Sequence, residues 1–486
     1  MALTEQASTL SVDDRIALGR AARDRRPRGS LATWRPTPYR LDPIDLLAGQ
    51  EADRVPALLP LRHARIGSSA FAFFRGSAIV MAADLGAMST SGLTVQLSGD
   101  AHLANFGVFL GSDRRPAFGE DDFDETLPGP FEWDVLRLAT SFVVAGLERT
   151  PTAASDSAAR ARAGAGRKAA LAAAQSYRTT MRDNAGRTAV SLWYARDDEE
   201  TLRAWARTEP RSNRLLADVK AGRAGARAES VRSAVEHFTT VKGGRPQFAE
   251  GTTIARIGTA DPLADHLGEV FAAYRRALPP DRAELLSRYE IVDTGHKTVG
   301  VGSVGLPDFV LLVQGRLRED LLILQLKQTQ ASALLAGVPS PAEPDWRTDA
   351  ERIVLGARRG QPGTDVFLGA ADLPGGPSRY VRQLRDGKWA PDLATLSNGR
   401  LVDFARLCGH ALARSHARTG DPIAIAAYLG KSQTFDTAVL AFARRYADQV
   451  AADARAYRRA LGSERLPAAA TISRRTLLDG LRESII

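Results

Sequence analysis

Two short acidic segments in the first third of the chain carry the residue types that phosphoryl transfer needs. The segment VQLSGDAHLANFGVFL places Asp100, His102 and Asn105 in a tight loop between two apolar, strand-like pieces. The later segment FGEDDFDETLPGP places Asp122 and Asp124 after another short strand. Carboxylates gathered at strand ends are unfavourable unless a cation or a shared proton lies between them. One Asp that orients the nucleophile, with an Asn and a second Asp that hold Mg²⁺, would form such a set.

Other interpretations of these segments stay open. Asp and Asn are common turn formers, so the loop can also be an acidic surface loop beside an Asx-turn. His102 either structures the loop through backbone hydrogen bonds or takes part in catalysis. A metal centre built from His102, Asp100 and Asp122 has thin support, because the sequence shows no H-x-H or H-E-x-x-H pattern.

A second group of residues lies about 200 positions further on. Gly300, Gly302 and Gly305 form a GxGxxG string that is followed by LPDFVLLVQG, which predicts a strand where a dinucleotide-binding fold needs a helix. A strand, a glycine turn and a strand are typical of the hairpin that covers phosphates in kinases. The next strand, LLILQLKQ, ends near Lys327, and Glu351 in WRTDAERIVLGARR is the expected helix partner of that lysine. The alternative is a Gly-rich hairpin with an edge-strand lysine.

Composition limits the class of protein. No apolar run approaches the ~18 residues that cross a bilayer, and the first residues lack the order of a secretion signal. The one cysteine, Cys408, excludes an internal disulfide framework and a cysteine-built zinc site. We therefore expect a cytoplasmic protein without a membrane partner. The net charge is +9, but Arg is spread over the whole chain and no basic block is interleaved with aromatics, which disfavours nucleic acid as a partner.

The order D-x-H-x-x-N, hairpin, D-F-D resembles the catalytic and metal loops of the aminoglycoside and choline kinase branch of the kinase superfamily. The resemblance implies that Asp100 is the catalytic-loop Asp, with Asn105, Asp122 and Asp124 as metal ligands. It implies ATP and Mg as cofactors, with Lys327 and the glycines at the phosphates. Asp134, in EWDVLRLATSF, would brace the catalytic loop from a helix start.

In ordinary kinases the glycine hairpin precedes the catalytic loop, whereas here it follows it. The expected fold is therefore α+β, a two-lobed protein-kinase-like fold that is circularly permuted and carries added helical segments. RYVRQL would link the lobes, and the helix LVDFARLCGHALARSHA would be the one that normally comes just before the catalytic loop. We expect a loosely packed lead-in over residues 1–60 and the catalytic and metal-loop part of the large lobe over 61–150. A solvent-facing helical insertion or large-lobe helices would follow over 151–285. The nucleotide-binding small lobe would span 286–390, and C-terminal helices that complete the large lobe would span 391–486.

Most of the chain also resembles one bacterial family, the domain of unknown function 2252. The matching strings include SSAFAFFRG, GDAHLANFG, DDFDETLPGPFEWDVLRLATS, VGVGSVG, YVRQLRD and LARSHARTGD. This chain departs from the family pattern at Glu120, Asp121 and Gln328, and the charge of the first two would raise the pKa of Asp122. Arg75 in FFRG either grips a phosphate or an acidic substrate, or braces the acidic loop.

The sequence thus favours an ATP- and Mg-dependent phosphotransferase that acts on an unknown small-molecule or protein acceptor. The alternatives are a nucleotidyl transferase on the same scaffold and a kinase-shaped protein that binds a nucleotide or metabolite without turnover. Neither the acceptor nor the oligomeric state follows from the sequence.

Overall fold

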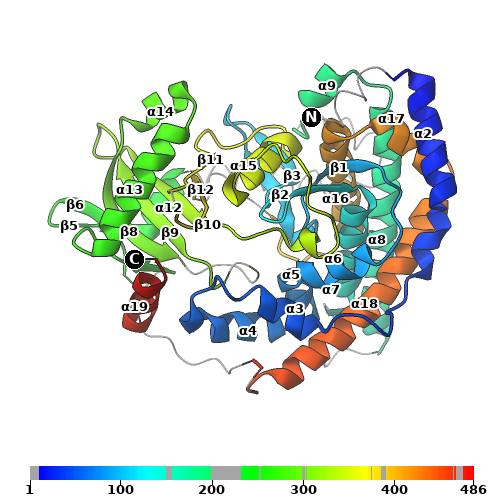
Figure 1. The fold of residues 1–486 in the computed structure, drawn as a ribbon, viewed down its shortest axis with the longest axis horizontal. Helices are drawn as coiled ribbons and strands as arrows, with labels where there is room; N and C mark the ends of the chain where they lie inside the picture. Colours follow the sequence, from blue (N-terminus) through cyan, green and yellow to red (C-terminus); the bar gives the residue numbers. More distant parts are fainter. Residues whose placement is uncertain are drawn as a thin grey trace.

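A computed structural model describes residues 10–148, 156–198, 231–250, 253–297, 302, 304–373, 375–384, 390–393, 395–463, 465–466 and 474–485. It is a mixed α+β molecule in which a part built on a β-sheet lies beside a helix-rich part (Figure 1). Helix α15 (Asp349–Gly360) and the strands β2 (Phe106–Leu110) and β3 (Pro116–Glu120) lie between the two parts in this view.

The sheet has six strands in the order β11-β12-β10-β9-β8-β7, and neighbouring strands pair antiparallel. Their bounds are Ile254–Arg256 (β7), Glu290–Lys297 (β8), Asp308–Gln314 (β9), Leu321–Gln328 (β10), Gly369–Ala370 (β11) and Arg379–Gln383 (β12). The strands expected within 288–330 and at RYVRQL are confirmed. Helix α15 lies in sequence between β10 and β11, so β12 pairs with β10 after a crossover.

The two faces of the sheet follow the period-2 alternation of its strands. Leu324 and Leu326 on β10 face a core that is closed by α13 (Pro262–Ala277), α14 (Pro280–Leu286) and α19 (Arg474–Ile485). Ile323 and its neighbours on the opposite face pack against α12 (Val231–Phe238), β6 (Arg245–Phe248) and β7. Strand β6 pairs with β5 (Thr239–Lys242).

The helix-rich part is organised around α16 (Asn398–Thr419), which packs against α8 (Asp156–Asn184). Helices α7 (Glu132–Glu148), α17 (Pro422–Leu429) and α18 (Thr434–Ala460) surround this pair and share its core. The expected helix LVDFARLCGHALARSHA is confirmed as α16. A short helix, α9 (Ala189–Trp193), follows α8.

The Ala-rich helix α8 is not the solvent-facing helix that the sequence suggested. Its small side chains, with Tyr177 and Met181, are buried against α7 and α16. A Cβ at Gly409 of α16 would lie 2.2 Å from the backbone oxygen of Ala173, so small residues let the two helices approach closely. The remaining Ala/Arg-rich stretch, 199–230, lies outside the described residues.

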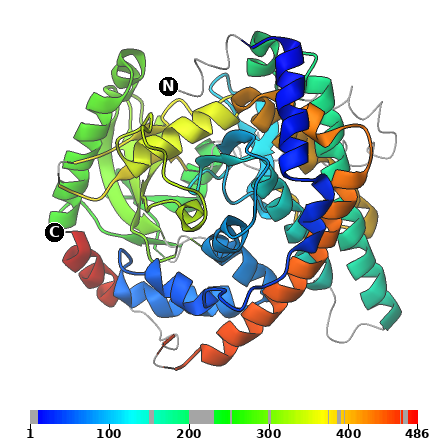
Figure 2. The same ribbon diagram turned by 45° about the vertical axis from the view of Figure 1, so that its right-hand side comes forward.

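The N-terminal residues from 10 onward are also better packed than the loose lead-in that we expected. Helix α2 (Val12–Arg25) contacts α17, and the 3-10 helix η1 (Arg28–Thr33) contacts α18. Leu31 and Trp34 are buried in the main core. Figure 2 shows this segment, in dark blue, running along α18 towards α3 (Pro43–Gly49).

Short elements connect the two parts. They are η2 (Pro56–Leu58), α4 (Leu59–Gly67), α5 (Ala70–Gly76), α6 (Ala78–Gly86), β1 (Thr94–Leu97), η3 (Leu103–Asn105), β4 (Leu127–Pro130) and η5 (Ala333–Ala336). Strand β1 pairs with β4, and β2 pairs with β3, so both acidic segments lie on loops between short strands, as expected.

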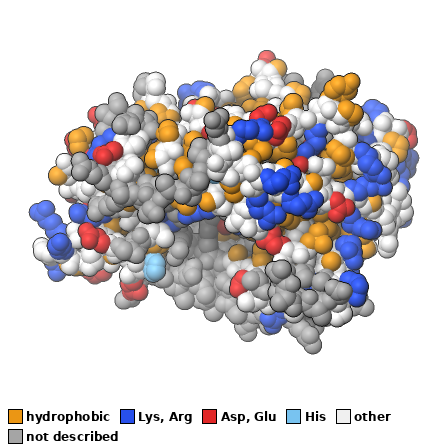
Figure 3. Space-filling view, turned by 90° about the horizontal axis from the view of Figure 1, so that it is seen from below, with side chains coloured by type: hydrophobic (Ala, Val, Ile, Leu, Met, Phe, Trp, Pro, Cys, Tyr) orange, Lys and Arg blue, Asp and Glu red, His pale blue; other side chains and the backbone are white. Residues whose placement is uncertain are grey.

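Lys and Arg side chains gather on the right-hand half of the face in Figure 3, among apolar, uncharged and some acidic ones. Within the described ranges, none of the helices has the length and apolar character that crossing a membrane requires.

Candidate functional site

The loop that carries Asp100 is hydrogen-bonded to a residue in the first turn of α7. Gly99 has φ +86°, and a Cβ there would lie 2.3 Å from the carbonyl oxygen of Glu125, so the turn needs glycine. The backbone N–H groups of Ser98 and Gly99 donate to the carboxylate of Asp134 at 2.8 and 3.2 Å. His416 Nε2 of α16 lies 3.3 Å from the same carboxylate. The bracing role expected for Asp134 is therefore confirmed by its hydrogen bonds.

Asp100 contacts residues from two directions. The Asn105 side-chain amide donates to the Asp100 carbonyl oxygen at 2.9 Å. Nε of Arg137, a buried residue of α7, donates to Asp100 Oδ1 at 2.5 Å. Arg137 is itself held by the Phe74 carbonyl at 2.9 Å and lies over the Phe74 ring. Burial raises the pKa of Asp100 to about 7, although Arg137 acts in the opposite direction.

His102 is a buried member of the same turn. Its backbone N–H donates to the Asp100 carbonyl at 2.6 Å, and its carbonyl accepts from the Asn105 N–H at 2.8 Å. Its Nε2 lies 3.6 Å from Asp100 Oδ2. Burial, with the nearby charges of Arg75 and Arg137, lowers the pKa of His102 well below its ordinary value. A neutral imidazole therefore stands beside Asp100.

The second acidic segment meets the sheet through Asp124. Lys327 Nζ lies 2.6 Å from Asp124 Oδ2, and the Tyr380 hydroxyl donates to Asp124 Oδ1 at 2.6 Å. Burial acts to raise the pKa of Asp124, but Lys327 and Arg382 outweigh it and lower this pKa to about 2. Burial likewise opposes the charge of Lys327, yet Asp124 raises the pKa of the lysine above its ordinary value.

Asp122 and Glu125 flank Asp124 in the same segment, and both line the cleft. Asp122 Oδ1 accepts a hydrogen bond from the Asp124 backbone at 3.3 Å, and burial followed by the charge of Asp124 raises the pKa of Asp122. Glu125 accepts from the Ala333 N–H of η5 at 2.5 Å, and burial raises its pKa. Phe123, between the acids, packs against α15. The acidic segment is thus fixed by apolar and backbone contacts, while its carboxylates crowd together.

One cleft collects these residues. It is narrow, with a cavity volume of about 120 Å³. The sequence-predicted residues that line it are Asp100, His102, Asn105, Asp122, Asp124 and Gly302, and Glu125, Arg54 and Arg75 join them. Lys327 is connected to the wall of this cleft by its ion pair with Asp124. The two parts of the sequence that were expected to form one site are therefore brought together.

The described part of the glycine loop is held by arginines from the N-terminal segment. Arg62 Nη1 donates to the Gly302 carbonyl at 2.5 Å, and Arg54 Nη1 donates to the Val304 carbonyl at 2.6 Å. Burial, with the charge of Arg62, lowers the pKa of Arg54 to about 9. Gly305 has φ +98°, which favours glycine. Gly300 lies outside the described residues.

Glu351 is not brought to Lys327. Its carboxylate accepts from Arg347 Nη2 at 2.5 Å near the start of α15, and this hydrogen bond lowers the pKa of Glu351. The next residue, Arg352, is the one that α15 turns towards the acidic loop. Arg352 is buried and donates to the carbonyls of Asp124 and Thr126 at 3.1 and 2.7 Å. The expected helix partner is therefore corrected: the anion that pairs with Lys327 comes from the acidic loop.

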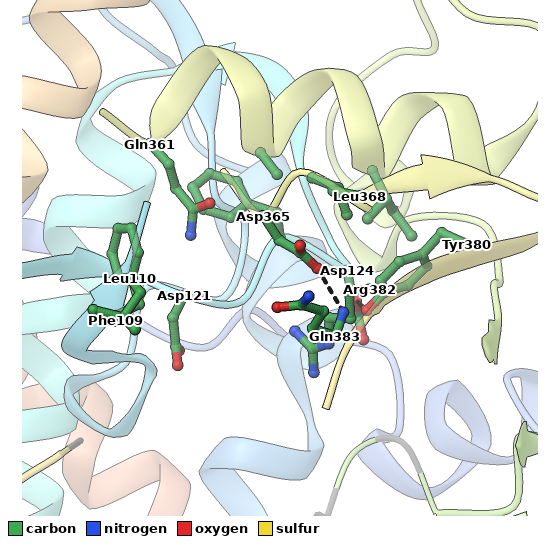
Figure 4. Close-up of a pocket in the computed structure, with 13 residues that line it drawn as sticks. Phe109, Leu110, Asp121, Asp124, Gln361, Asp365, Leu368, Tyr380, Arg382 and Gln383 are labelled. Atoms are coloured by element: carbon green, nitrogen blue, oxygen red, sulfur yellow. Dashed lines mark hydrogen bonds between the residues drawn. The ribbon is translucent and has the colours of Figure 1, made fainter. Parts of the chain in front are cut away.

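A second, smaller hollow adjoins the cleft and shares Asp124 with it (Figure 4). Tyr380, Arg382 and Gln383 of β12 line one side, and Asp121 lines the other. The hydrogen bond from the Gln383 N–H to Asp365 closes this end at 2.5 Å. Sequence reasoning missed Tyr380 and Arg382, although their alternation in YVRQL places both on one face of the strand.

The sheet face beside Lys327 is polar. Buried Gln325 donates to both carboxylate oxygens of Asp308, at 2.9 and 2.7 Å, and accepts from Arg382 Nε at 3.0 Å. Burial raises the pKa of Asp308 to about 6. Beyond this network, Phe238 of α12 belongs to the apolar cluster that covers the same face. Lys327 lies opposite Asp308 in the register of β9 and β10, so it shares this polar face of the sheet.

The oxygen donors in the cleft suit a hard divalent cation. Asp122, Glu125 and Asn105 provide carboxylate and amide oxygens, and burial raises the pKa of both acids, to which the charge of Asp124 adds. In the described ranges, however, no group of three or more His, Cys, Asp and Glu side chains is arranged to hold a metal alone. Mg²⁺ commonly takes one or two carboxylates and completes its shell with phosphate oxygens and water, so the donors fit that mode.

Comparison with known proteins gives one match. A family model described as an uncharacterized protein conserved in bacteria (DUF2252) covers residues 54–460. Neither the curated proteins nor the solved structures contain a match to this sequence. The matched range includes the acidic loops, the glycine loop, Lys327 and α16, so the chain belongs to the bacterial domain of unknown function 2252 family.

Proposed function

We propose that the protein is an ATP- and Mg-dependent phosphotransferase with a circularly permuted, kinase-like two-lobed fold. One observation carries the proposal: the ion pair of Lys327 with Asp124 brings the lysine strand to the cleft that Asp100, Asn105, Asp122 and Gly302 line. Phosphoryl transfer depends on this combination of a lysine, a glycine loop and hard oxygen ligands around the phosphates.

The order of the elements supports the proposal. Strand β8, the glycine loop, β9, the lysine strand β10, helix α15 and the link strand β12 follow one another, and α16 comes next. In kinases the catalytic loop then continues from that helix. Here the end of α16 lies against β1, where the Gln96 N–H donates to Thr419 Oγ1 at 3.2 Å. A circular permutation is feasible where the chain ends that it exchanges lie close together. The contact brings the end of α16 close to β1, the strand that leads into the loop of Asp100.

Each residue then has a defined task. Asp100 accepts a hydrogen bond from the acceptor hydroxyl and orients it. Asp122 and Asn105 would hold Mg²⁺, and the ion would supply positive charge to the phosphate groups. Arg54 and Arg75 also line the cleft, and their positive charge favours an anion. The cavity of about 120 Å³ offers room for phosphate groups beside these residues.

The pairing of Asp100 with Arg137 favours a second candidate function. A carboxylate already bound at 2.5 Å by a buried guanidinium is less available to a substrate hydroxyl. The same fold would then bind a nucleotide or metabolite without turnover. A nucleotidyl transferase on this scaffold would use the same cleft and differ in the phosphorus atom attacked.

Transfer of radiolabel separates these candidates. Wild type, Asp100→Asn and Asp113→Asn would be incubated with Mg²⁺, cell extract and ATP labelled at the γ or the α phosphate. Asp113 is a matched control because it lies in the β2–β3 turn, paired with Arg196, away from the cleft. We expect γ-label transfer by wild type and Asp113→Asn, and a loss of about 10²-fold in Asp100→Asn. Transfer of α-label alone would indicate nucleotidyl transfer, and binding of Mg·ATP without any transfer would support the binding protein.

A further inference from the structure

The largest cavity among those described lies between the N-terminal segment and α6, away from the acidic cleft. Its volume is about 470 Å³, within the range of small-molecule sites. Residues of η1, the following loop, α3, α6 and η5 line it. None of the described residues lines both this cavity and the cleft. The function proposed above therefore leaves this cavity unexplained.

Buried polar atoms without partners line this cavity. Arg26, which directly follows α2, is 3% exposed, and its Nε has no hydrogen-bond partner among the described residues. Ser30 Oγ on η1 is also buried, and it too has no hydrogen-bond partner among the described residues. A buried guanidinium N–H without an acceptor is costly, and an anion that enters the cavity would satisfy it.

The charges of the residues that line the cavity also favour an anion. Arg40 also lines the cavity, but its guanidinium is saturated by two carboxylates, Asp84 at 2.8 Å and Asp453 at 2.7 Å. Among the described residues of the lining, Asp84 is the one acid, and it pairs with Arg40, so no other carboxylate among them neutralises Arg26 and Arg35. Electrostatics therefore favour a negatively charged occupant.

The rest of the lining is apolar or carries hydroxyl groups. Trp34 forms part of the wall together with aliphatic side chains, namely Leu41, Leu46, Val80, Ala83, Ala87 and Met88. Such a wall accommodates a hydrocarbon or ring body, while the hydroxyls of Thr33 and Thr37 add hydrogen-bonding groups. A bare inorganic ion would leave most of this surface without contacts.

We propose that this cavity binds a small ligand with an apolar body and one phosphate or carboxylate group, which Arg26 and Ser30 hold. The guanidinium N–H groups donate to the oxyanion, the Ser30 hydroxyl donates a further hydrogen bond, and the apolar body packs beside Trp34. The site is independent of the phosphotransferase proposal.

Isothermal titration calorimetry on the full-length protein tests the proposal with four compounds. Phenyl phosphate and benzoate carry the two candidate anions on one apolar body, benzyl alcohol lacks the charge, and inorganic phosphate lacks the body. We expect phenyl phosphate or benzoate, whichever anion the site takes, to bind more tightly than benzyl alcohol and inorganic phosphate. Failure of both anionic compounds to bind at 10 mM would overturn the proposal.

Variants locate the binding. Arg26→Gln should weaken the tighter anionic compound by about tenfold or more, the scale of one charge-assisted hydrogen bond, and Ser30→Ala should weaken it less. Arg20→Gln removes the same charge from the exposed side of α2 and should leave affinity unchanged. Ala83→Leu fills the cavity while keeping Arg26, so it reports on the site if Arg26→Gln fails to fold. A loss in Arg75→Gln instead would place the anion in the acidic cleft and reject the cavity.

Discussion

The Lys327 amine lies 2.6 Å from a carboxylate oxygen of Asp124, a residue 203 positions earlier in the chain. The lysine side chain is 9% exposed and that of Asp124 is 31% exposed, so the pair lies at the inner edge of the cleft. It fastens the sheet part to the acidic loop of the helix-rich part. The two parts are therefore joined at the candidate site itself.

This contact predicts a measurable coupling in stability. Lys327→Met and Asp124→Asn should each lower the free energy of unfolding by about 1–3 kcal/mol, because each leaves a partly buried charged or polar partner behind. The double variant should lose less than the sum. Urea unfolding of the four proteins gives the coupling. The pair of Arg347 and Glu351, which has a similar distance but an exposed arginine, is the control and should show a smaller coupling. Additive losses at Lys327 and Asp124 would mean that the contact does not form in solution.

The loop that carries Asp100 should depend on the glycine at position 99. Gly99→Ala places a methyl group 2.3 Å from the Glu125 carbonyl oxygen in a backbone with φ +86°, so we expect a loss of more than about 2 kcal/mol. Gly29→Ala is the control, because nothing lies within 4 Å of its Cβ position. Thermal unfolding of both variants checks the difference. Equal melting temperatures would show that the loop adopts another conformation.

Asp100 should leave a signature in the pH dependence of stability. Its pKa rises from 3.8 to about 7 on folding, so the folded protein binds more protons between these values and loses stability as the pH rises through that window. Asp100→Asn removes this loss, and its stability relative to wild type should therefore increase from pH 4 to pH 7. Urea unfolding at several pH values measures the difference.

Asp113→Asn is the control for this measurement. Burial acts to raise the pKa of Asp113, but its hydrogen bond with Arg196 outweighs it and lowers this pKa below its ordinary value. The contribution of Asp113 to the free energy of unfolding changes only at lower pH. The difference in this free energy between Asp113→Asn and wild type should therefore be flat between pH 5 and 8. A flat profile for Asp100→Asn as well would show that Asp100 ionises normally.

The parts of the site that the sequence predicted are those with local signals. GDAHLAN and DDFDET are short segments between strands, and their geometry follows from turn residues and a neighbouring helix start, as Asp134 shows. Lys327 was found because a lysine near the end of an apolar strand is conspicuous. These features need little knowledge of how distant elements pack.

The errors concern helix orientation and packing partners. Glu351 and Arg352 are neighbours, and the direction in which α15 presents each depends on its packing against the acidic loop. Arg137 reaches Asp100 through the arrangement of α7 beside α5, which no local pattern encodes. The Ala-rich α8 has a composition that suits exposed and closely packed helices alike, and its burial depends on small residues on its partners.

The last prediction concerns ligand linkage at the cleft. A ligand that binds only the folded protein adds about 2.7 kcal/mol to its stability at a hundredfold excess over the dissociation constant. We expect Mg·ATP to raise the melting temperature, and ATP without Mg²⁺ to raise it less, because the crowded carboxylates around Asp122 repel bare phosphates. Lys327→Met and Asp122→Asn should reduce the shift, whereas Asp100→Asn should keep most of it, since Asp100 is assigned to the acceptor. A shift that is indifferent to Mg²⁺, or equal in wild type and Asp122→Asn, would contradict a metal-bridged nucleotide in this cleft.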